Sequence, residues 1–152
     1  MSNNADREIV IARVFNAPRE LVFEAWLDPK HIDQWWGPRG FTTVTSSMNA
    51  TNGGAWHYVM RHEQYGEFKN RIVYREIVRP ERLVYTHDSG VDDDASAFEV
   101  TVSFVAQGAR TKLTMHSVFS SAAELERVKG FGAIEGGKQT LERLAERLAQ
   151  PH

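Results

Sequence analysis

The chain has 152 residues, the size of one domain with a substantial hydrophobic core. Its formal net charge is −2 and no basic run occurs, which argues against binding to a nucleic-acid backbone. The lack of cysteine excludes disulfides, thiol catalysis and thiolate metal sites. Without a signal-peptide core or a membrane span, we expect a single cytoplasmic domain over residues 1–152, ordered at about 7–149.

The N-terminal part predicts one strand followed by two short helices. Residues 8–15 form a run rich in β-branched residues, which is typical of a strand. Pro18 suits the first turn of a helix, and apolar residues at helical spacing extend this helix to Leu27. Asp28-Pro29 starts a second short helix that reaches residue 35 or 36, where a Gly-Pro-Arg-Gly cluster breaks it.

The middle of the chain predicts six further strands. They are separated by turn residues such as Asn52-Gly53-Gly54 and Pro80-Glu81. The expected strands lie at residues 41–48, 56–61, 68–78, 83–87, 98–104 and 113–119. Because the connections have hairpin length, the strands should form one antiparallel meander with the helices on one face, an α+β fold.

The last segment, residues 121–149, predicts a long helix. Ser121 and Glu124 have the spacing of a capping box. An apolar stripe follows at Leu141, Leu144, Ala145 and Leu148. Glycines interrupt the helix at positions 130, 132, 136 and 137. They indicate a break near 130–132, missing side chains that leave room between helix and sheet, or both.

No motif in the chain has a specific catalytic or metal-binding pattern. The glycines at 130–136 are spaced one residue too far apart for a dinucleotide fingerprint and occur late in the chain. The histidines at positions 57, 62, 87 and 116 lack metal-ligand spacing. We therefore expect no metal and no cofactor. Glu76 has the strand parity of Tyr74, so it is either a buried acid or base or, as we favour, a surface carboxylate.

The alternate strand residues that should face the interior are unusually rich in aromatic and thioether side chains, several with polar tips. Such residues suit a cavity for an apolar small molecule, although a solid aromatic core is the competing interpretation. The adjacent pair Trp35-Trp36 indicates one core anchor and one residue at a pocket rim. The predicted lining is Trp36, Trp56, Tyr58, Met60, Tyr74, Tyr85, Phe98, Met115, Phe131 and Ile134.

Several stretches of the chain carry a family resemblance. They are Ala17-Pro-Arg-Glu-Leu-Val-Phe-Glu-Ala-Trp26, Trp35-Trp36-Gly37-Pro38, Gly53-Gly54-Ala-Trp56, Tyr74-Arg-Glu-Ile77 and Pro80-Glu-Arg-Leu83. With them the chain resembles the START-like, helix-grip (SRPBCC) superfamily, in the branch similar to the C-terminal domain of the activator of heat-shock-protein-90 ATPase. The resemblance implies a curved antiparallel sheet of about seven strands around the long C-terminal helix, with two small helices closing one end.

Three functions follow as hypotheses. We favour a non-catalytic protein that holds an apolar small molecule, of the lipid, polyketide or aromatic class, between sheet and helix. An enzyme in the same cavity would use Glu76 or His87 as acid or base. The resemblance also implies a chaperone-activator role, which a single stand-alone domain makes less attractive.

Overall fold

The computed structural model describes residues 5–89 and 97–149, and these form an antiparallel sheet with helices on one face. A short 3-10 turn, η1 (Ala5–Arg7), precedes the first strand. The strands are β1 (Glu8–Phe15), β2 (Thr42–Met48), β3 (Ala55–His62), β4 (Gly66–Val78), β5 (Arg82–Asp88), β6 (Phe98–Gln107) and β7 (Arg110–Val118). The helices are α1 (Arg19–Leu27), α2 (Pro29–Trp35), α3 (Ala122–Gly130) and α4 (Ala133–Ala149).

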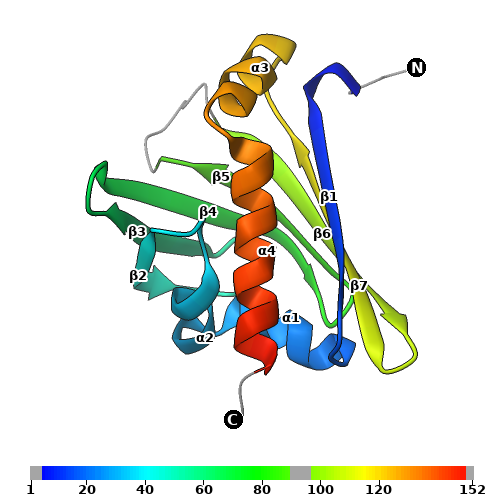
Figure 1. The fold of residues 1–152 in the computed structure, drawn as a ribbon. Coiled ribbons are helices and arrows are strands. Elements are labelled where there is room, and N and C mark those ends of the chain that lie inside the picture. Colours follow the sequence, from blue (N-terminus) through cyan, green and yellow to red (C-terminus); the bar gives the residue numbers. More distant parts are fainter. Residues whose placement is uncertain (1–4, 90–96, 150–152) are drawn as a thin grey trace.

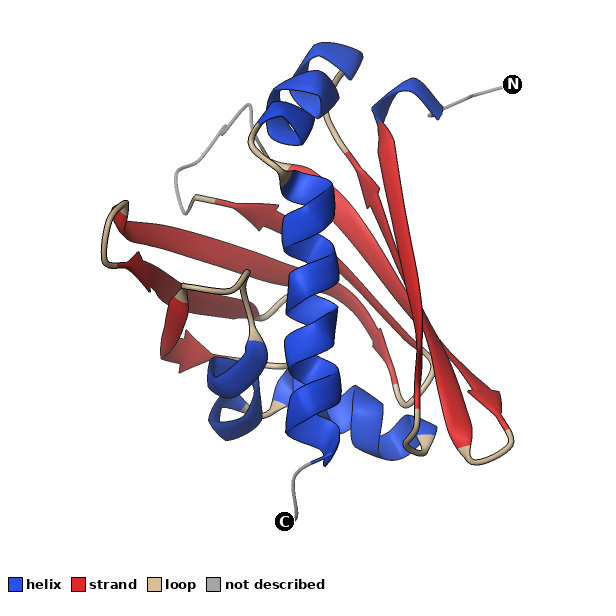
Figure 2. Cartoon of the chain, in the orientation of Figure 1, coloured by secondary structure: helices blue, strands red, loops and turns tan. Residues whose placement is uncertain are grey.

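The seven strands pair in the order β1-β7-β6-β5-β4-β3-β2, every pair antiparallel. Strands β2 to β7 are thus a meander, and β1 adds itself beside β7. Helix α4 crosses one face of the curved sheet, α1 and α2 close one end, and α3 lies at the other end (Figure 1). Figure 2 shows the helices on the same side of the sheet. This is the predicted helix-grip arrangement.

Local sequence signals account for most element ends. The strand predicted at residues 8–15 coincides with β1, and the Asp28 carboxylate caps α2 by accepting from the backbone N–H of Lys30 at 2.9 Å. The Ser121 hydroxyl accepts from the backbone N–H of Glu124 at 3.0 Å, as the capping box predicts. The expected break is also present, because Gly132 has φ +79° and separates α3 from α4.

The glycines of α4 permit close packing, which corrects the expectation that they leave room between helix and sheet. A Cβ atom on Gly137 would lie 2.5 Å from the Cδ1 atom of Ile11 on β1. A Cβ on Gly136 would lie 3.4 Å from the ring of Pro38. The missing side chains are therefore replaced by neighbours, and the backbone of α4 approaches β1 closely at this point.

Buried side chains form a large core and a small one. The large core joins α1, α2, the inner sheet face and the second half of α4, where Leu141 and Leu144 are buried. The small core consists of Ile9, Phe119 and Leu125, and it fixes α3 against the sheet. Ile11 contacts both cores. None of the described helices has the length and apolar character needed to cross a bilayer.

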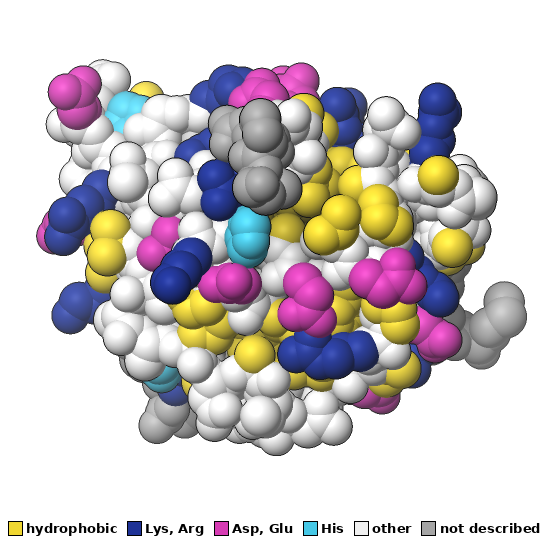
Figure 3. Space-filling view, turned by 90° about the horizontal axis from the view of Figure 1, so that it is seen from below, with side chains coloured by type: hydrophobic (Ala, Val, Ile, Leu, Met, Phe, Trp, Pro, Cys, Tyr) yellow, Lys and Arg dark blue, Asp and Glu magenta, His cyan; other side chains and the backbone are white. Residues whose placement is uncertain are grey.

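Figure 3 shows the end of the molecule that is seen from below in Figure 1. Apolar side chains appear there in small patches between acidic and basic groups. Three of the exposed aliphatic side chains of the protein are Val14, Leu21 and Val105. Charges of both signs are interspersed on this face, so its appearance favours neither a polyanion nor a polycation as partner.

Candidate functional site

Strand register brings the predicted lining residues of the sheet onto one face. Trp56 is opposite Ile72, Ile72 opposite His87, and His87 opposite Phe98. A second row runs across Tyr74, Tyr85 and Val100. Because directly opposed residues of a sheet point to the same side, these rows form a continuous inner surface beneath α4.

The structure brings together eight of the ten predicted lining residues. Five are buried: Trp36, Trp56, Tyr58, Tyr74 and Tyr85. Met60, Phe98 and Met115 are partly buried and pack against the same core. Phe131 and Ile134 lie apart from them, with exposed fractions of 80% and 36%. The Phe131 ring instead lies 5.7 Å from the guanidinium of Arg127, outside the interior.

The aromatic interior is filled, which is the competing interpretation noted for the sequence. The rings of Trp26, Trp35 and Trp36 pack edge to face at centroid distances of 4.9–5.6 Å. A small void of about 10 Å³ lies between these and neighbouring side chains, and it is lined by Trp26, Ile32, Trp36, Trp56, Ile72, Tyr74, Leu83 and Tyr85. This volume holds about one water molecule, so a larger guest requires α4 or a ring to move.

Two of the residues that line this void each carry a buried polar group without a hydrogen-bond partner among the residues that the structure describes. These groups are the indole N–H of Trp26 and the hydroxyl of Tyr74, and both residues are 2% exposed. Neighbouring indoles are satisfied: Trp35 donates to the carbonyl of Ala25 at 3.2 Å and Trp56 to the hydroxyl of Thr45 at 3.0 Å. Unpaired buried donors are uncommon in folded proteins, which singles out this void.

A polar chain runs beside the void. The side-chain N–H of Asn70 donates to the carbonyl of Phe68 at 3.0 Å, which turns its oxygen toward Nε2 of His87, also at 3.0 Å. Nε2 therefore carries a proton and donates it to Asn70. The Tyr58 hydroxyl lies 3.0 Å from the same nitrogen.

The buried tyrosines are donors at neutral pH. Burial raises the pKa of Tyr58, and a hydrogen bond from Trp36 opposes this only in part. Burial also raises the pKa of Tyr74 and of Tyr85. Each hydroxyl therefore stays protonated, and together they make the inner surface rich in O–H groups.

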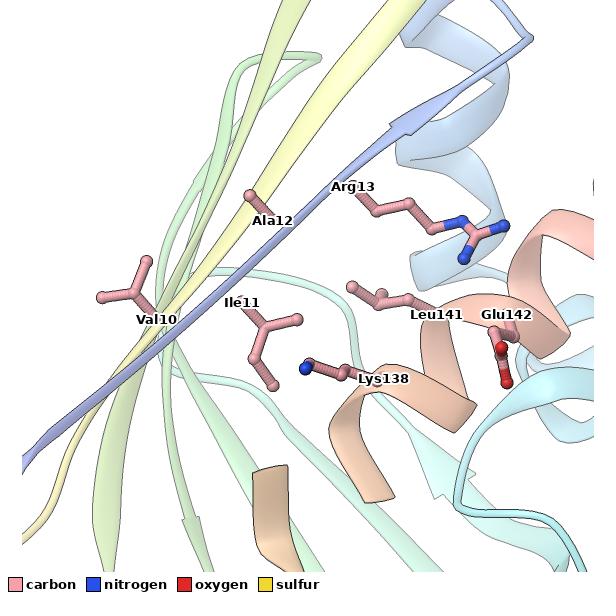
Figure 4. A pocket seen from close by; sticks show the side chains of 7 residues that line it. All are labelled: Val10, Ile11, Ala12, Arg13, Lys138, Leu141 and Glu142. Carbon is pink, nitrogen blue, oxygen red and sulfur yellow. The ribbon is translucent and has the colours of Figure 1, made fainter. Parts of the chain in front are cut away.

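Two surface grooves flank α4 where it passes β1, and sequence analysis missed both. The first has a volume of about 310 Å³ and is lined by Val10, Ile11, Ala12, Arg13, Lys138, Leu141 and Glu142. The second, of about 440 Å³, continues past Arg13 to Ala145 and Leu148. In Figure 4 the side chains of Ile11 and Leu141 point between β1 and α4, whereas Val10 points away. Only the pairing of α4 with β1, which no sequence pattern records, could have revealed these grooves.

The comparisons with known proteins decide the family. The sequence model of the family described as "Activator of Hsp90 ATPase homolog 1-like protein" matches residues 16–149. The chain belongs to this family. No curated protein matches the chain at a significant level.

Solved structures share the fold of this family member. A protein from Arthrobacter aurescens is similar at 22% identity and a TM-score of 0.90, over 99% of this chain and 91% of that one. A protein from Chromobacterium violaceum is similar at 25% identity and a TM-score of 0.81, over 95% of this chain and 99% of that one. The AHSA1 protein from Silicibacter pomeroyi is similar at 25% identity and a TM-score of 0.73, over 95% of this chain and 99% of that one.

The two residues considered as acid or base are poorly placed for catalysis in this family member. A register shift between Tyr74 and Glu76 pairs Glu76 with Val84 and moves its side chain to the outer face. There its carboxylate accepts from Nε of Arg82 at 2.7 Å, with both side chains 44% exposed. Nε2 of His87 already donates to Asn70, so this nitrogen is not available as a base. Among the described residues, no cluster of three or more acidic or histidine side chains could hold a metal.

Proposed function

We propose that this protein binds an apolar small molecule between the sheet and α4. The observation that carries the proposal is how unequally α4 is buried. Its buried residues, Thr140, Leu141 and Leu144, all lie in the second half. The first half, residues 133–139, contacts Ile11 of β1, which is apolar and only partly buried, as is its cross-strand neighbour Met115.

The ligand would enter by displacing this first half of α4. Gly132, with its positive φ, precedes the segment and offers a hinge. Displacement would uncover Met115, Phe98 and the aromatic rows below them. Burial of apolar ligand surface would supply the driving force, at about 25 cal/mol per Å² before ordering costs are subtracted. Lipids, polyketides and aromatic compounds are the classes that such a lining suits.

A reversible cross-link between α4 and β1 tests the proposal. The chain has no cysteine, so Ile11→Cys with Gly137→Cys would introduce the only two thiols. These positions face each other, because a Cβ at 137 lies 4.0 Å from Cγ1 of Ile11. Native mass spectrometry against a lipid and polyketide panel should show ligand bound to the reduced protein and none bound to the oxidised protein.

The two single-cysteine variants serve as controls for this experiment. Neither can form the cross-link, so ligand binding by each should be the same in the oxidised and reduced conditions; in Gly137→Cys the retained Ile11 must also shift to admit the new Cβ. Binding that is equal in the oxidised and reduced double variant would contradict entry beneath the first half of α4. Failure of the wild-type protein to bind any member of the panel would contradict the proposed function itself.

The family description favours a second candidate, a chaperone-activator role. The grooves along β1 and α4 would then be the natural contact surface, since they combine apolar residues with the charged groups of Arg13, Lys138 and Glu142. Stimulation of a chaperone ATPase by this protein, abolished by Arg13→Glu, would support the role. Absence of both stimulation and co-purification would remove it.

A further inference from the structure

We infer that the ligand carries a neutral hydrogen-bond acceptor, such as a ketone, ester or ether oxygen, which Trp26 and Tyr74 bind at the bottom of the site. This inference rests on the proposed function and goes further by naming the chemistry of the ligand's innermost end. It starts from the two unpartnered donors, which line the same void.

Both groups offer a proton and need an acceptor. The indole N–H of Trp26 is a donor only. Burial raises the pKa of the Tyr74 hydroxyl, which therefore remains protonated and able to donate. An acceptor oxygen has two lone pairs, so it can take one hydrogen bond from each donor that it reaches. A guest that brings only carbon to this void would leave both donors unpaired.

The remaining wall of the void selects a neutral acceptor over an anion. Its other residues are the aliphatic Ile32, Ile72 and Leu83 and the aromatic Trp36, Trp56 and Tyr85. None of the eight described lining residues carries a charge. A carboxylate placed here would lose its hydration without gaining a cation, which is far more costly than burying a carbonyl.

The two donors also make a prediction for the free protein. A buried hydroxyl without a partner destabilises the fold, so its removal should be favourable. Tyr74→Phe is expected to raise Tm by about 2–4 °C. Tyr65→Phe makes the same chemical change at a side chain that is 63% exposed, and it should leave Tm unchanged. A gain in stability together with a loss in ligand binding is the signature of a residue kept for function.

Indane and 1-indanone are suitable probes, because they share a ring system and differ by one carbonyl oxygen. Affinities are measured by calorimetry, and the indole N–H signals are followed by NMR, with Trp26→Phe identifying the signal of Trp26. Tyr74→Phe should weaken the binding of 1-indanone about 5-fold, which corresponds to the loss of one neutral hydrogen bond. The affinity for indane should stay unchanged or increase slightly. Tyr65→Phe should change neither affinity. Addition of 1-indanone, and not of indane, should shift the Trp26 N–H signal.

Several outcomes would overturn the inference. An equal effect of Tyr74→Phe on the affinities of both probes would show that the hydroxyl does not donate a hydrogen bond to the carbonyl. A fall in Tm for Tyr74→Phe would show that the hydroxyl is already satisfied in the free protein, for example by a buried water. Binding of both probes with equal affinity in every variant would leave the proposed function standing and remove the acceptor. Binding of neither probe would overturn the inference, whereas the proposed function is decided separately by the lipid and polyketide panel.

Discussion

The two halves of α4 differ in how deeply their side chains are buried. Residues 140–149 supply Leu141 and Leu144 to the main core, and Arg143 binds the loop after α2. Residues 133–139 hold two glycines and an Ile134 that is 36% exposed. The second half of α4 therefore holds the fold together, whereas the first half is less buried and is the part that a ligand would displace under the proposed function.

The largest expected difference in unfolding free energy is between truncations of an apolar side chain in the two halves. Leu144→Ala should lower the free energy of unfolding by about 2–5 kcal/mol, because Leu144 is fully buried in the main core. Ile134→Ala should cost about 1 kcal/mol or less. Urea denaturation measures both. Equal losses would mean that the first half of α4 is as firmly packed as the second.

Arg143 offers the next test, because its guanidinium ties the second half of α4 to the end of α2. Nη1 lies 2.9 Å from the carbonyl of Gly37 and 3.2 Å from those of Trp36 and Phe41. Arg143→Met should cost about 1.5–3 kcal/mol, the range for hydrogen bonds to a charged group. The matched control is Arg39→Met, which removes an exposed ion pair with Glu146 and should change unfolding little.

A smaller effect is expected where the first half of α4 touches β1. Gly137→Ala adds a Cβ that meets Cδ1 of Ile11 at 2.5 Å, so the gain in helix propensity should be lost. Ile11→Val removes Cδ1, and the double variant should recover about 1 kcal/mol relative to additivity. Gly130→Ala, with open space around it, should stabilise by up to about 1 kcal/mol. Strict additivity of the 137 and 11 substitutions would contradict the close approach.

The smallest effect concerns pH. A hydrogen bond from Arg39 lowers the pKa of the Glu146 carboxylate. This carboxylate therefore stabilises the fold above the pKa it has when unfolded, and the contribution disappears as pH falls through the lower folded value. The stability difference between wild type and Glu146→Gln should be small at neutral pH and vanish once the pH lies below the lowered folded pKa of Glu146. A difference that grows on acidification would contradict the assigned sign.

Sequence patterns predicted the elements well because turns, caps and alternation are local properties. They predicted side-chain placement less well, since that depends on contacts between distant elements. Glu76 shares the parity of Tyr74 in the sequence, yet the bulge between them reverses its direction. Ile134 lies seven residues before Leu141 on the same helix stripe, but packing beneath that end of α4 is incomplete.

The filled interior and the small void beside Trp26 could not be predicted from the sequence either. Aromatic richness is compatible with a cavity and with a solid core, and only the packing of Trp26, Trp35 and Trp36 distinguishes them. Trp26 was missing from the predicted lining because its helical spacing marks a core residue. Its indole N–H is unpaired because no acceptor among the described residues lies within reach, and the sequence does not show this.

The separate small core under α3 has a consequence for the size of the entrance. Ile9, Phe119 and Leu125 hold α3, and Ala133 packs against this cluster, while Leu141 holds α4 from the other side. The distance along the helix axis from Ala133 to Leu141 is roughly 12 Å at the rise of an α-helix. Under the proposed function, the stretch that moves is therefore short, and we expect narrow fused-ring or single-chain compounds to enter beneath it more readily than broad, branched ones.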